Sequence, residues 1–121
     1  MQEENISYKA AVASTDGIVV NSHFGKADTF YIFQIDDKQI TPLEKRSVQP
    51  VCRQGDHDEE QLLQNCQTLT DCKYVLVARI GYRAAECLRQ LSVIPMELPD
   101  LIEAALDKLI AYDQIQHLFD R

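Results

Sequence analysis

Three features that would each place a protein in a particular class are scarce or missing in this sequence. The longest apolar run, residues 74–78, is far too short to cross a bilayer. The four cysteines form no C-x-x-C pair, which makes a zinc or iron–sulfur cage built by the chain itself unexpected. Only 12 basic residues stand against 19 acidic ones, and the net charge of −7 disfavours nucleic acid and anionic membranes as partners.

The apolar segment of a signal peptide is missing as well. The N-terminus opens with Glu3 and Glu4, so we expect a soluble cytoplasmic protein whose cysteines are free thiols. Hydrophobic residues make up 45% and charged residues 26% of the chain, close to the average of globular proteins. We therefore expect one folded domain over residues 1–121, built around a hydrophobic core.

The first half of the chain predicts antiparallel strands joined by short turns. Residues 8–14 predict a first strand, and the Asp-Gly pair after it is typical of a hairpin turn into a second strand over residues 18–20. The aromatic and β-branched run 29–36 predicts a central strand. The more polar residues 39–47 predict an edge strand that follows it.

In the second half, helices and strands alternate. A capping-box pattern predicts a helix over residues 56–67, and the apolar residues 74–78 predict a buried parallel strand. A second helix is expected over residues 82–91, and a short edge strand containing a proline over residues 93–96. Another capping box opens a final amphipathic helix at about residue 101.

This order of elements predicts an α/β fold with three layers, α/β/α, around a mixed sheet. Ribonuclease-H-like topology is the nearest common architecture. In such sheets, ligands bind beyond the carboxyl ends of the strands, near a switch in strand order. If strands 8–14 and 74–78 are parallel neighbours, then Ser14, the loop around His23 and residues 79–81 gather at one end of the sheet.

The loop of residues 20–27, called the histidine loop below, carries the polar groups of the candidate binding site. It lies between two apolar runs, where a scaffold fixes the ends of a loop and leaves its backbone accessible. His23 offers a ring nitrogen to a metal, because neutral imidazole is available as a ligand near physiological pH. Gly25 and Lys26 follow it in the same loop. The alternative is a surface or hydrogen-bonded histidine that binds no metal.

A second candidate feature is the strand-to-helix turn between Arg79 and Gly81. The first N–H groups of the following helix, from Gly81 to Arg83, form a natural site for an anion. Arg79 and Arg83 add positive charge, and Lys26 contributes from the histidine loop. Together with an imidazole, these groups suit an anionic ligand that contains a metal. The alternative is an ordinary turn glycine beside solvated arginines.

Two sequence blocks resemble a known family. The block VNSHFGKA at residues 20–27, with AVAS at 11–14 before it and FYIF at 30–33 after it, is similar to the first family block. The block DCKYVLVARIG at residues 71–81 is similar to the second. Together they resemble the dinitrogenase iron–molybdenum cofactor biosynthesis family, the NifX-like proteins, over about residues 8–112.

The resemblance implies a ribonuclease-H-like fold and a carrier that is not an enzyme. Such a carrier holds an iron–sulfur or iron–molybdenum cluster, the nitrogenase cofactor or its precursor, and its partners are nitrogenase-assembly proteins. The histidine of the family falls on His23, which is therefore the expected metal ligand. The other expected cluster-binding residues are Ser14, Asn21, Phe24, Gly25, Lys26, Arg79, Gly81 and Arg83.

The chain departs from the family pattern in two places. Many relatives have glycine or proline after the Ile-Gly pair, where this chain has Tyr82 and Arg83. The linker that holds Cys52 and His57 resembles the cysteine-bearing linker of the family only in outline. Cys52 is therefore either a second, soft metal ligand or a loop thiol without a function. The other three cysteines lie on apolar stripes or at a strand entry, where we expect structural roles for Cys66, Cys72 and Cys87.

Two other functions are compatible with such a fold. A metal-dependent nuclease needs several carboxylates at one site. Here Asp16 lies in a turn, while Asp36 and Asp37 lie at the far end of the third expected strand, so we do not expect a nuclease. The remaining alternative is a metabolite- or metal-sensing domain, or a scaffold domain, of the same fold with no bound cluster. In that case His23 holds no metal.

Overall fold

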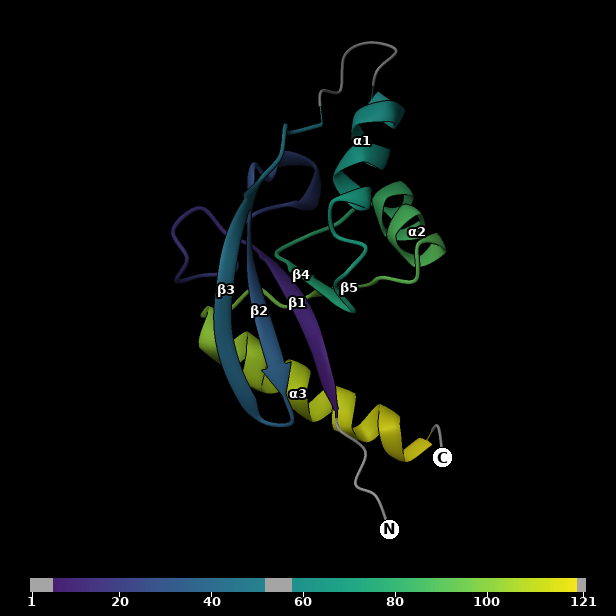
Figure 1. Ribbon diagram of the computed structural model, residues 1–121. Helices are drawn as coiled ribbons and strands as arrows, with labels where there is room; N and C mark the ends of the chain where they lie inside the picture. Colours follow the sequence, from purple (N-terminus) through teal and green to yellow (C-terminus); the bar gives the residue numbers. More distant parts are fainter. Residues whose placement is uncertain (1–5, 52–57, 120–121) are drawn as a thin grey trace.

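The computed structural model describes residues 6–51 and 58–119, and Figure 1 shows how their helices and strands are arranged. The described residues form a mixed sheet, three α-helices and one 3₁₀ helix. In chain order the elements are β1 (Ser7–Ala13), η1 (Phe24–Lys26), β2 (Thr29–Asp36), β3 (Gln39–Ser47), α1 (Asp58–Gln67), β4 (Tyr74–Val77), α2 (Tyr82–Gln90), β5 (Ile94–Glu97) and α3 (Ile102–Phe119).

The sheet has the strand order β3-β2-β1-β4-β5. β2 runs antiparallel to both β1 and β3, whereas β4 runs parallel to β1 and β5 parallel to β4. The expected mixed sheet is therefore confirmed, and its order is compatible with ribonuclease-H-like topology. The parallel pairing of β1 with β4, in register at Val12 and Leu76, places the carboxyl ends of both strands at one edge of the sheet.

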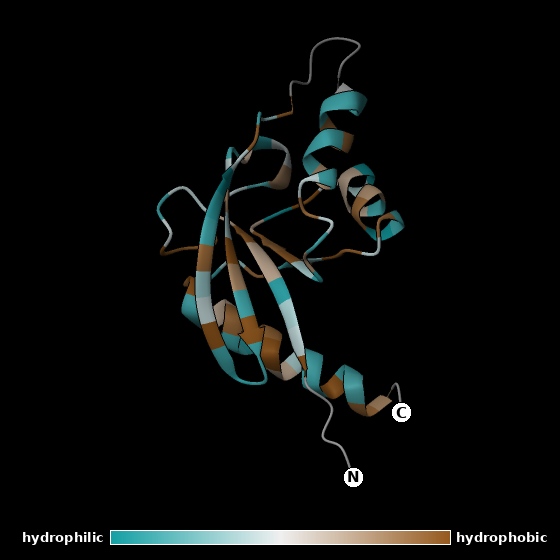
Figure 2. Cartoon of the chain, viewed as in Figure 1, coloured by the Kyte–Doolittle hydropathy of each residue, from teal (hydrophilic) through white to brown (hydrophobic). Residues whose placement is uncertain are grey.

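Helices cover both faces of the sheet, which confirms the three layers. Side chains alternate along a strand, so Ala11 and Ala13 of β1 pack in the core beneath α1 and α2. Ala10 and Val12 pack on the other face, against α3. In Figure 2, brown and teal bands mark the apolar and polar residues along β2 and β3. The helix α3 contributes five buried residues to this second core: Ile102, Ala105, Leu106, Leu109 and Ile110.

The strand expected over residues 18–20 is wrong, and so is the hairpin turn before it. The carboxylate of Asp16 accepts the N–H groups of Ile18 at 2.9 Å and Val19 at 3.1 Å, and these bonds lower the pKa of Asp16. Val20 is fully buried and donates its N–H to the backbone carbonyl of Asp100. Of this run only Val20 packs in the core beneath α3, while Ile18 is exposed, and β1 pairs with β2 directly.

The other elements lie close to their expected positions. The strands expected over 29–36 and 39–47 coincide with β2 and β3. The helix α3 continues to Phe119, and no helix among residues 6–51 and 58–119 is long and apolar enough to cross a bilayer. Cys66, Cys72 and Cys87 are free thiols, as expected. Burial raises the pKa of the Cys72 thiol to about 12, which suits an inert core position.

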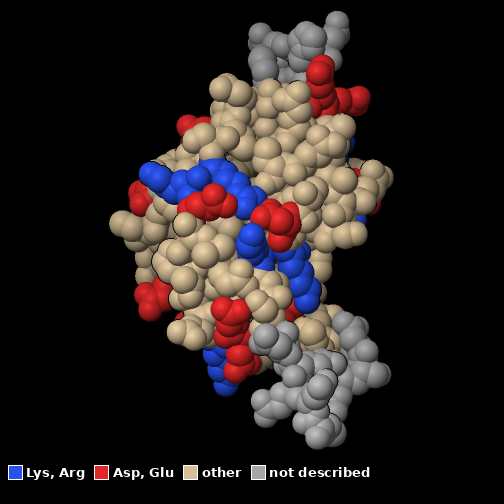
Figure 3. Space-filling model, viewed as in Figure 1, with Lys and Arg blue, Asp and Glu red and all other residues tan. Residues whose placement is uncertain are grey.

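Ion pairs connect the segment before β4 to strands of the sheet and to α3. On the face seen in Figure 3, basic and acidic side chains lie next to one another. Arg46 of β3 pairs with Asp71 before β4 at 2.8 Å, and Lys9 of β1 lies 3.2 Å from the same carboxylate. The buried carboxylate of Asp113 in α3 accepts hydrogen bonds from Lys73 at 2.8 Å and from the Tyr74 hydroxyl at 2.5 Å. The Asp113 contacts tie α3 to the sheet at the end away from the histidine loop.

Candidate functional site

Backbone pairing joins the histidine loop to the turn after β4. His23 forms a parallel bridge with Arg79, and the Phe24 N–H donates to the Arg79 carbonyl at 2.9 Å. One step earlier, the Ala78 N–H donates to the Ser22 carbonyl at 2.9 Å. The loop and the turn therefore behave as one short extension of the sheet beyond the end of β4. The expected gathering of these two segments is confirmed.

Phe24 anchors the loop from below. Its ring is buried in the core beneath α1 and α2, with its centroid 5.7 Å from that of Phe30. The short η1 helix follows, in which the Lys26 N–H donates to the His23 carbonyl at 3.1 Å. With Phe24 directed into the core, the neighbouring side chains of His23 and Lys26 are exposed to solvent. The imidazole is therefore accessible to a ligand.

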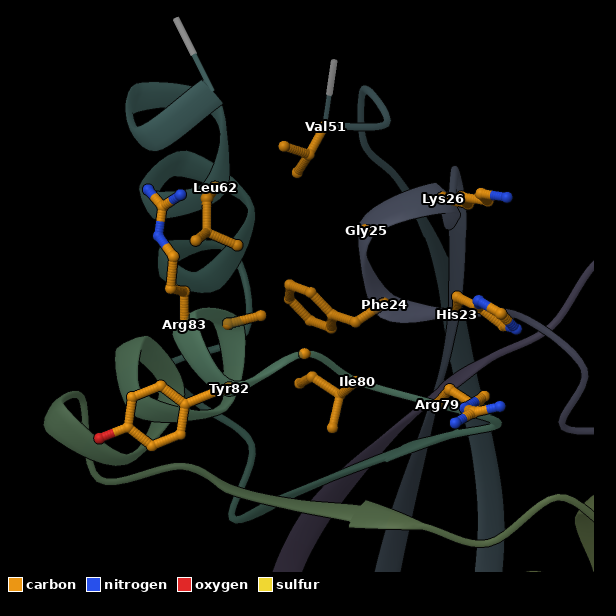
Figure 4. Close-up of a pocket in the computed structure, with 12 residues that line it drawn as sticks. His23, Phe24, Gly25, Lys26, Val51, Leu62, Arg79, Ile80, Tyr82 and Arg83 are labelled. Carbon is orange, nitrogen blue, oxygen red and sulfur yellow. The ribbon is translucent and has the colours of Figure 1, made fainter. Parts of the chain in front are cut away.

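A cavity of about 610 Å³ opens beside the loop and the turn. Histidine-loop residues form one wall and the first turn of α2 forms another, with Val51 and Leu62 facing them (Figure 4). No acidic residue occurs among the residues that the structure describes as lining it. Those residues are His23, Phe24, Gly25, Lys26, Val51, Leu62, Arg79, Ile80, Gly81, Tyr82, Arg83 and Ala84.

The basic side chains around this cavity fall into two groups. Figure 4 shows His23, Lys26 and Arg79 directed to one side, away from the space between Phe24 and Leu62, while Arg83 lies across the cavity on α2. Arg83 pairs with Glu59 of α1 at 2.6 Å, with both side chains largely exposed. No acidic side chain in the described part of the chain forms a comparable pair with Lys26 or Arg79. The uncompensated positive charge therefore lies beside His23, not around Arg83.

The turn at Gly81 leaves open space above the first turn of α2. Gly81 is the N-cap residue, in extended conformation with φ −77° and ψ 163°, and its lack of a side chain leaves the helix end without a side-chain cap. The first N–H groups of a helix have no acceptor within that helix. A Cβ atom built on Gly81 meets nothing within 4 Å, so the fold itself does not require glycine here. The space is open to a ligand.

Ser14 and Asn21 lie outside the cavity lining and hold the loop that leads to it. The buried hydroxyl of Ser14 accepts the Gly17 N–H at 3.0 Å. The Asn21 carboxamide accepts the Thr15 N–H at 3.0 Å and donates to the Thr15 hydroxyl at 2.9 Å. A direct contact of either residue with a ligand stays a prediction. Cys52 and His57 lie outside the described residues.

Sequence reasoning missed one side chain that touches the turn. Glu97, the last residue of β5, accepts the Ile80 N–H at 2.9 Å through Oε2. The apolar wall of Val51 and Leu62 was missed as well, since it depends on how α1 packs. Within the described residues, no three His, Cys, Asp or Glu side chains lie close enough together to hold a metal ion. His23 is the one metal-ligand type in the described lining.

Comparisons with known proteins agree on one family. The chain matches the family model described as "Dinitrogenase iron-molybdenum cofactor" over residues 7–112. The FeMo cofactor biosynthesis protein NifB of Frankia alni is 32% identical over 102 residues, which cover 82% of this chain and 20% of that protein. The chain thus spans only about a fifth to a quarter of the NifB relatives that head the comparison.

Solved structures confirm the fold. The crystal structure of PH0822 superposes with a TM-score of 0.66 at 22% identity, covering 85% of this chain and 90% of that one. The NMR structure of a putative NifB protein from Thermotoga gives a TM-score of 0.60 at 18% identity, covering 84% of this chain and 86% of that one. At these identities the likeness concerns the arrangement of helices and strands.

Proposed function

This chain belongs to the dinitrogenase iron–molybdenum cofactor family, and from that membership we propose that it carries an iron–sulfur or iron–molybdenum cluster as cargo during assembly of the nitrogenase cofactor. The name of the NifB relatives supports a place in cofactor biosynthesis. Because the match covers about a fifth of such a protein, the proposal concerns binding and transfer and includes no catalytic step. Other nitrogenase-assembly proteins deliver and receive the cargo.

The accessible imidazole of His23 is the observation that carries this proposal. A ring nitrogen of neutral histidine coordinates iron. His23 is exposed, lies at the rim of the cavity and is fixed through its backbone to Arg79. One protein ligand occupies the terminal position of one iron. The terminal positions of the other irons stay with thiolate ligands or bind to a donor or acceptor protein. A cluster held in this way is easily passed on.

Charge supports an anionic cargo. The chain carries a net charge of −7, yet the described lining of the cavity contains Lys26, Arg79 and Arg83 and no acid. Clusters with thiolate and sulfide ligands are commonly anions, and a local positive field raises their concentration at the site. The first N–H groups of α2 also support an anionic cargo, because a helix N-terminus favours negative charge.

The test is an anaerobic titration with a synthetic iron–sulfur cubane that carries exchangeable thiolate ligands. Visible absorption follows uptake, and electron paramagnetic resonance of the reduced cluster reports its environment. We expect saturable binding of one cluster per chain and co-elution of iron with the protein in gel filtration. A protein that leaves the column without iron contradicts the proposal, and favours a sensing or scaffold domain with the same fold.

A further inference from the structure

Glu97 holds the turn at the rim of the cavity, although its charge is of the same sign as that of the proposed cargo. Its Oε2 atom accepts the Ile80 N–H at 2.9 Å, one residue before the N-cap Gly81. The side chain is exposed, and no basic side chain in the part of the chain described by the structure forms an ion pair with it. Glu97 is thus an acidic group bound to the turn that carries Arg79, one of the basic residues that line the cavity.

The sheet brings Glu97 to this position. β4 and β5 are parallel, with Val77 in register with Glu97, and the Leu98 N–H donates to the Val77 carbonyl at 2.9 Å. The side chain of Glu97 therefore reaches the residues that follow Val77. The backbone of the histidine loop holds the first two of them, Ala78 and Arg79. Glu97 alone among described side chains holds the third, Ile80.

We propose that Glu97 is a positioning residue for the turn at residues 79–81 and that its charge limits the affinity for the cargo. The proposal rests on the carrier function given above. A neutral acceptor would hold the same N–H group, so the carboxylate adds a negative charge that positioning does not need. The carboxylate accepts the N–H group between Arg79 and Gly81, just before the start of α2, where its charge opposes an anion. A carrier has to release its cargo, and weaker binding speeds release.

Two substitutions separate the roles of the hydrogen bond and of the charge. Glu97→Gln keeps an acceptor oxygen and removes the charge, so we expect the iron–sulfur cubane to bind about threefold more tightly at low salt and with less gain at high salt. Glu97→Ala removes both, and we expect about fivefold weaker binding than in Glu97→Gln, since the turn is no longer held. Glu103→Gln on α3 changes the net charge equally and serves as the control, with unchanged affinity.

Amide hydrogen exchange tests the positioning role without any cargo. In the unloaded protein we expect the Ile80 N–H to exchange about tenfold faster in Glu97→Ala than in the wild type, and at the wild-type rate in Glu97→Gln. Unchanged exchange of Ile80 in Glu97→Ala overturns the positioning role. Binding in Glu97→Gln no tighter than in the wild type overturns the role of the charge. If the wild type takes up no cubane, the carrier function fails, while exchange at Ile80 still decides whether Glu97 holds the turn.

Discussion

His23 and Arg79 are paired in parallel beyond the carboxyl end of β4, although they lie in separate halves of the sequence. The Phe24 N–H donates to the Arg79 carbonyl at 2.9 Å and continues the pairing by one step. An imidazole and a guanidinium are thereby fixed at one rim of a cavity whose described lining contains no acid. A ligand that coordinates His23 meets the positive charge of Arg79 next to it.

Replacing His23 by alanine should remove the coordinate bond and little else. We expect His23→Ala to bind the iron–sulfur cubane at least about tenfold more weakly, a loss of roughly 1.4 kcal/mol. The thermal unfolding midpoint should stay nearly unchanged, because the side chain is exposed. His117→Ala, on α3, is the matched control and should keep wild-type affinity. Equal affinity in His23→Ala, measured by absorption titration, removes His23 from the mechanism.

Reversing the charge at Arg79 should weaken binding in a way that salt can mask. We expect Arg79→Glu to lose affinity for the cubane most strongly at low ionic strength, because exposed charges are screened by salt. Arg89→Glu at the other end of α2 makes the same change of charge away from the cavity and should have a much smaller effect. Titrations at several salt concentrations measure both variants. A loss in Arg79→Glu that does not vary with salt contradicts an electrostatic role.

Two glycines should respond differently to alanine. Gly17 has φ +75°, and a Cβ there would lie 3.0 Å from the Tyr31 ring, so Gly17→Ala should lower the free energy of unfolding by about 1–2 kcal/mol. Gly81→Ala meets open space and should cost only about 0.5 kcal/mol, yet weaken cubane binding by filling the space above α2. Chemical denaturation and titration compare them. Full affinity in Gly81→Ala would show that the cargo does not approach this turn.

The ion pair between Arg46 and Asp71 should make stability depend on acid pH. Two hydrogen bonds of 2.8 Å from Arg46 are the main reason that the pKa of Asp71 is lowered in the folded protein. A lowered pKa stabilises the fold above the unfolded value, about pH 4, and this contribution is lost as the pH falls further. Arg46→Met should therefore differ most from the wild type in urea denaturation above about pH 5, with a smaller difference near about pH 2. A difference that is constant with pH would contradict this reading.

Much of the fold follows from local pattern. The aromatic run of β2 and the polar run of β3 were located correctly, because alternation and turn residues mark strand limits directly. Residues 18–20 were wrongly predicted as a strand, since Val20 packs beneath α3 and does not pair in the sheet. An Asp-Gly pair also serves a loop in which Asp16 captures nearby N–H groups. Short apolar runs do not distinguish these two causes.

The candidate site was predictable only in part. The meeting of the histidine loop with Arg79 follows from placing β1 beside β4, a topological argument that sequence supports. The sequence does not show that Arg83 is paired while Lys26 and Arg79 are not. Arg83 pairs with Glu59 because α1 packs on α2. The contact of Glu97 with Ile80 depends on the register of β4 and β5. The pairing register of two strands that are far apart in the sequence cannot be read from the residues of either strand alone.

The most direct test of the account is pulsed electron paramagnetic resonance of the reduced, cubane-loaded protein with nitrogen isotopes introduced into histidine alone. A ring nitrogen bound to iron produces a hyperfine coupling that changes with the isotope. We predict this coupling in the wild type and in His117→Ala, and its disappearance in His23→Ala loaded at high cubane concentration. A loaded wild type without histidine nitrogen coupling, or a coupling that survives in His23→Ala, would contradict the assignment of His23 as the cluster ligand.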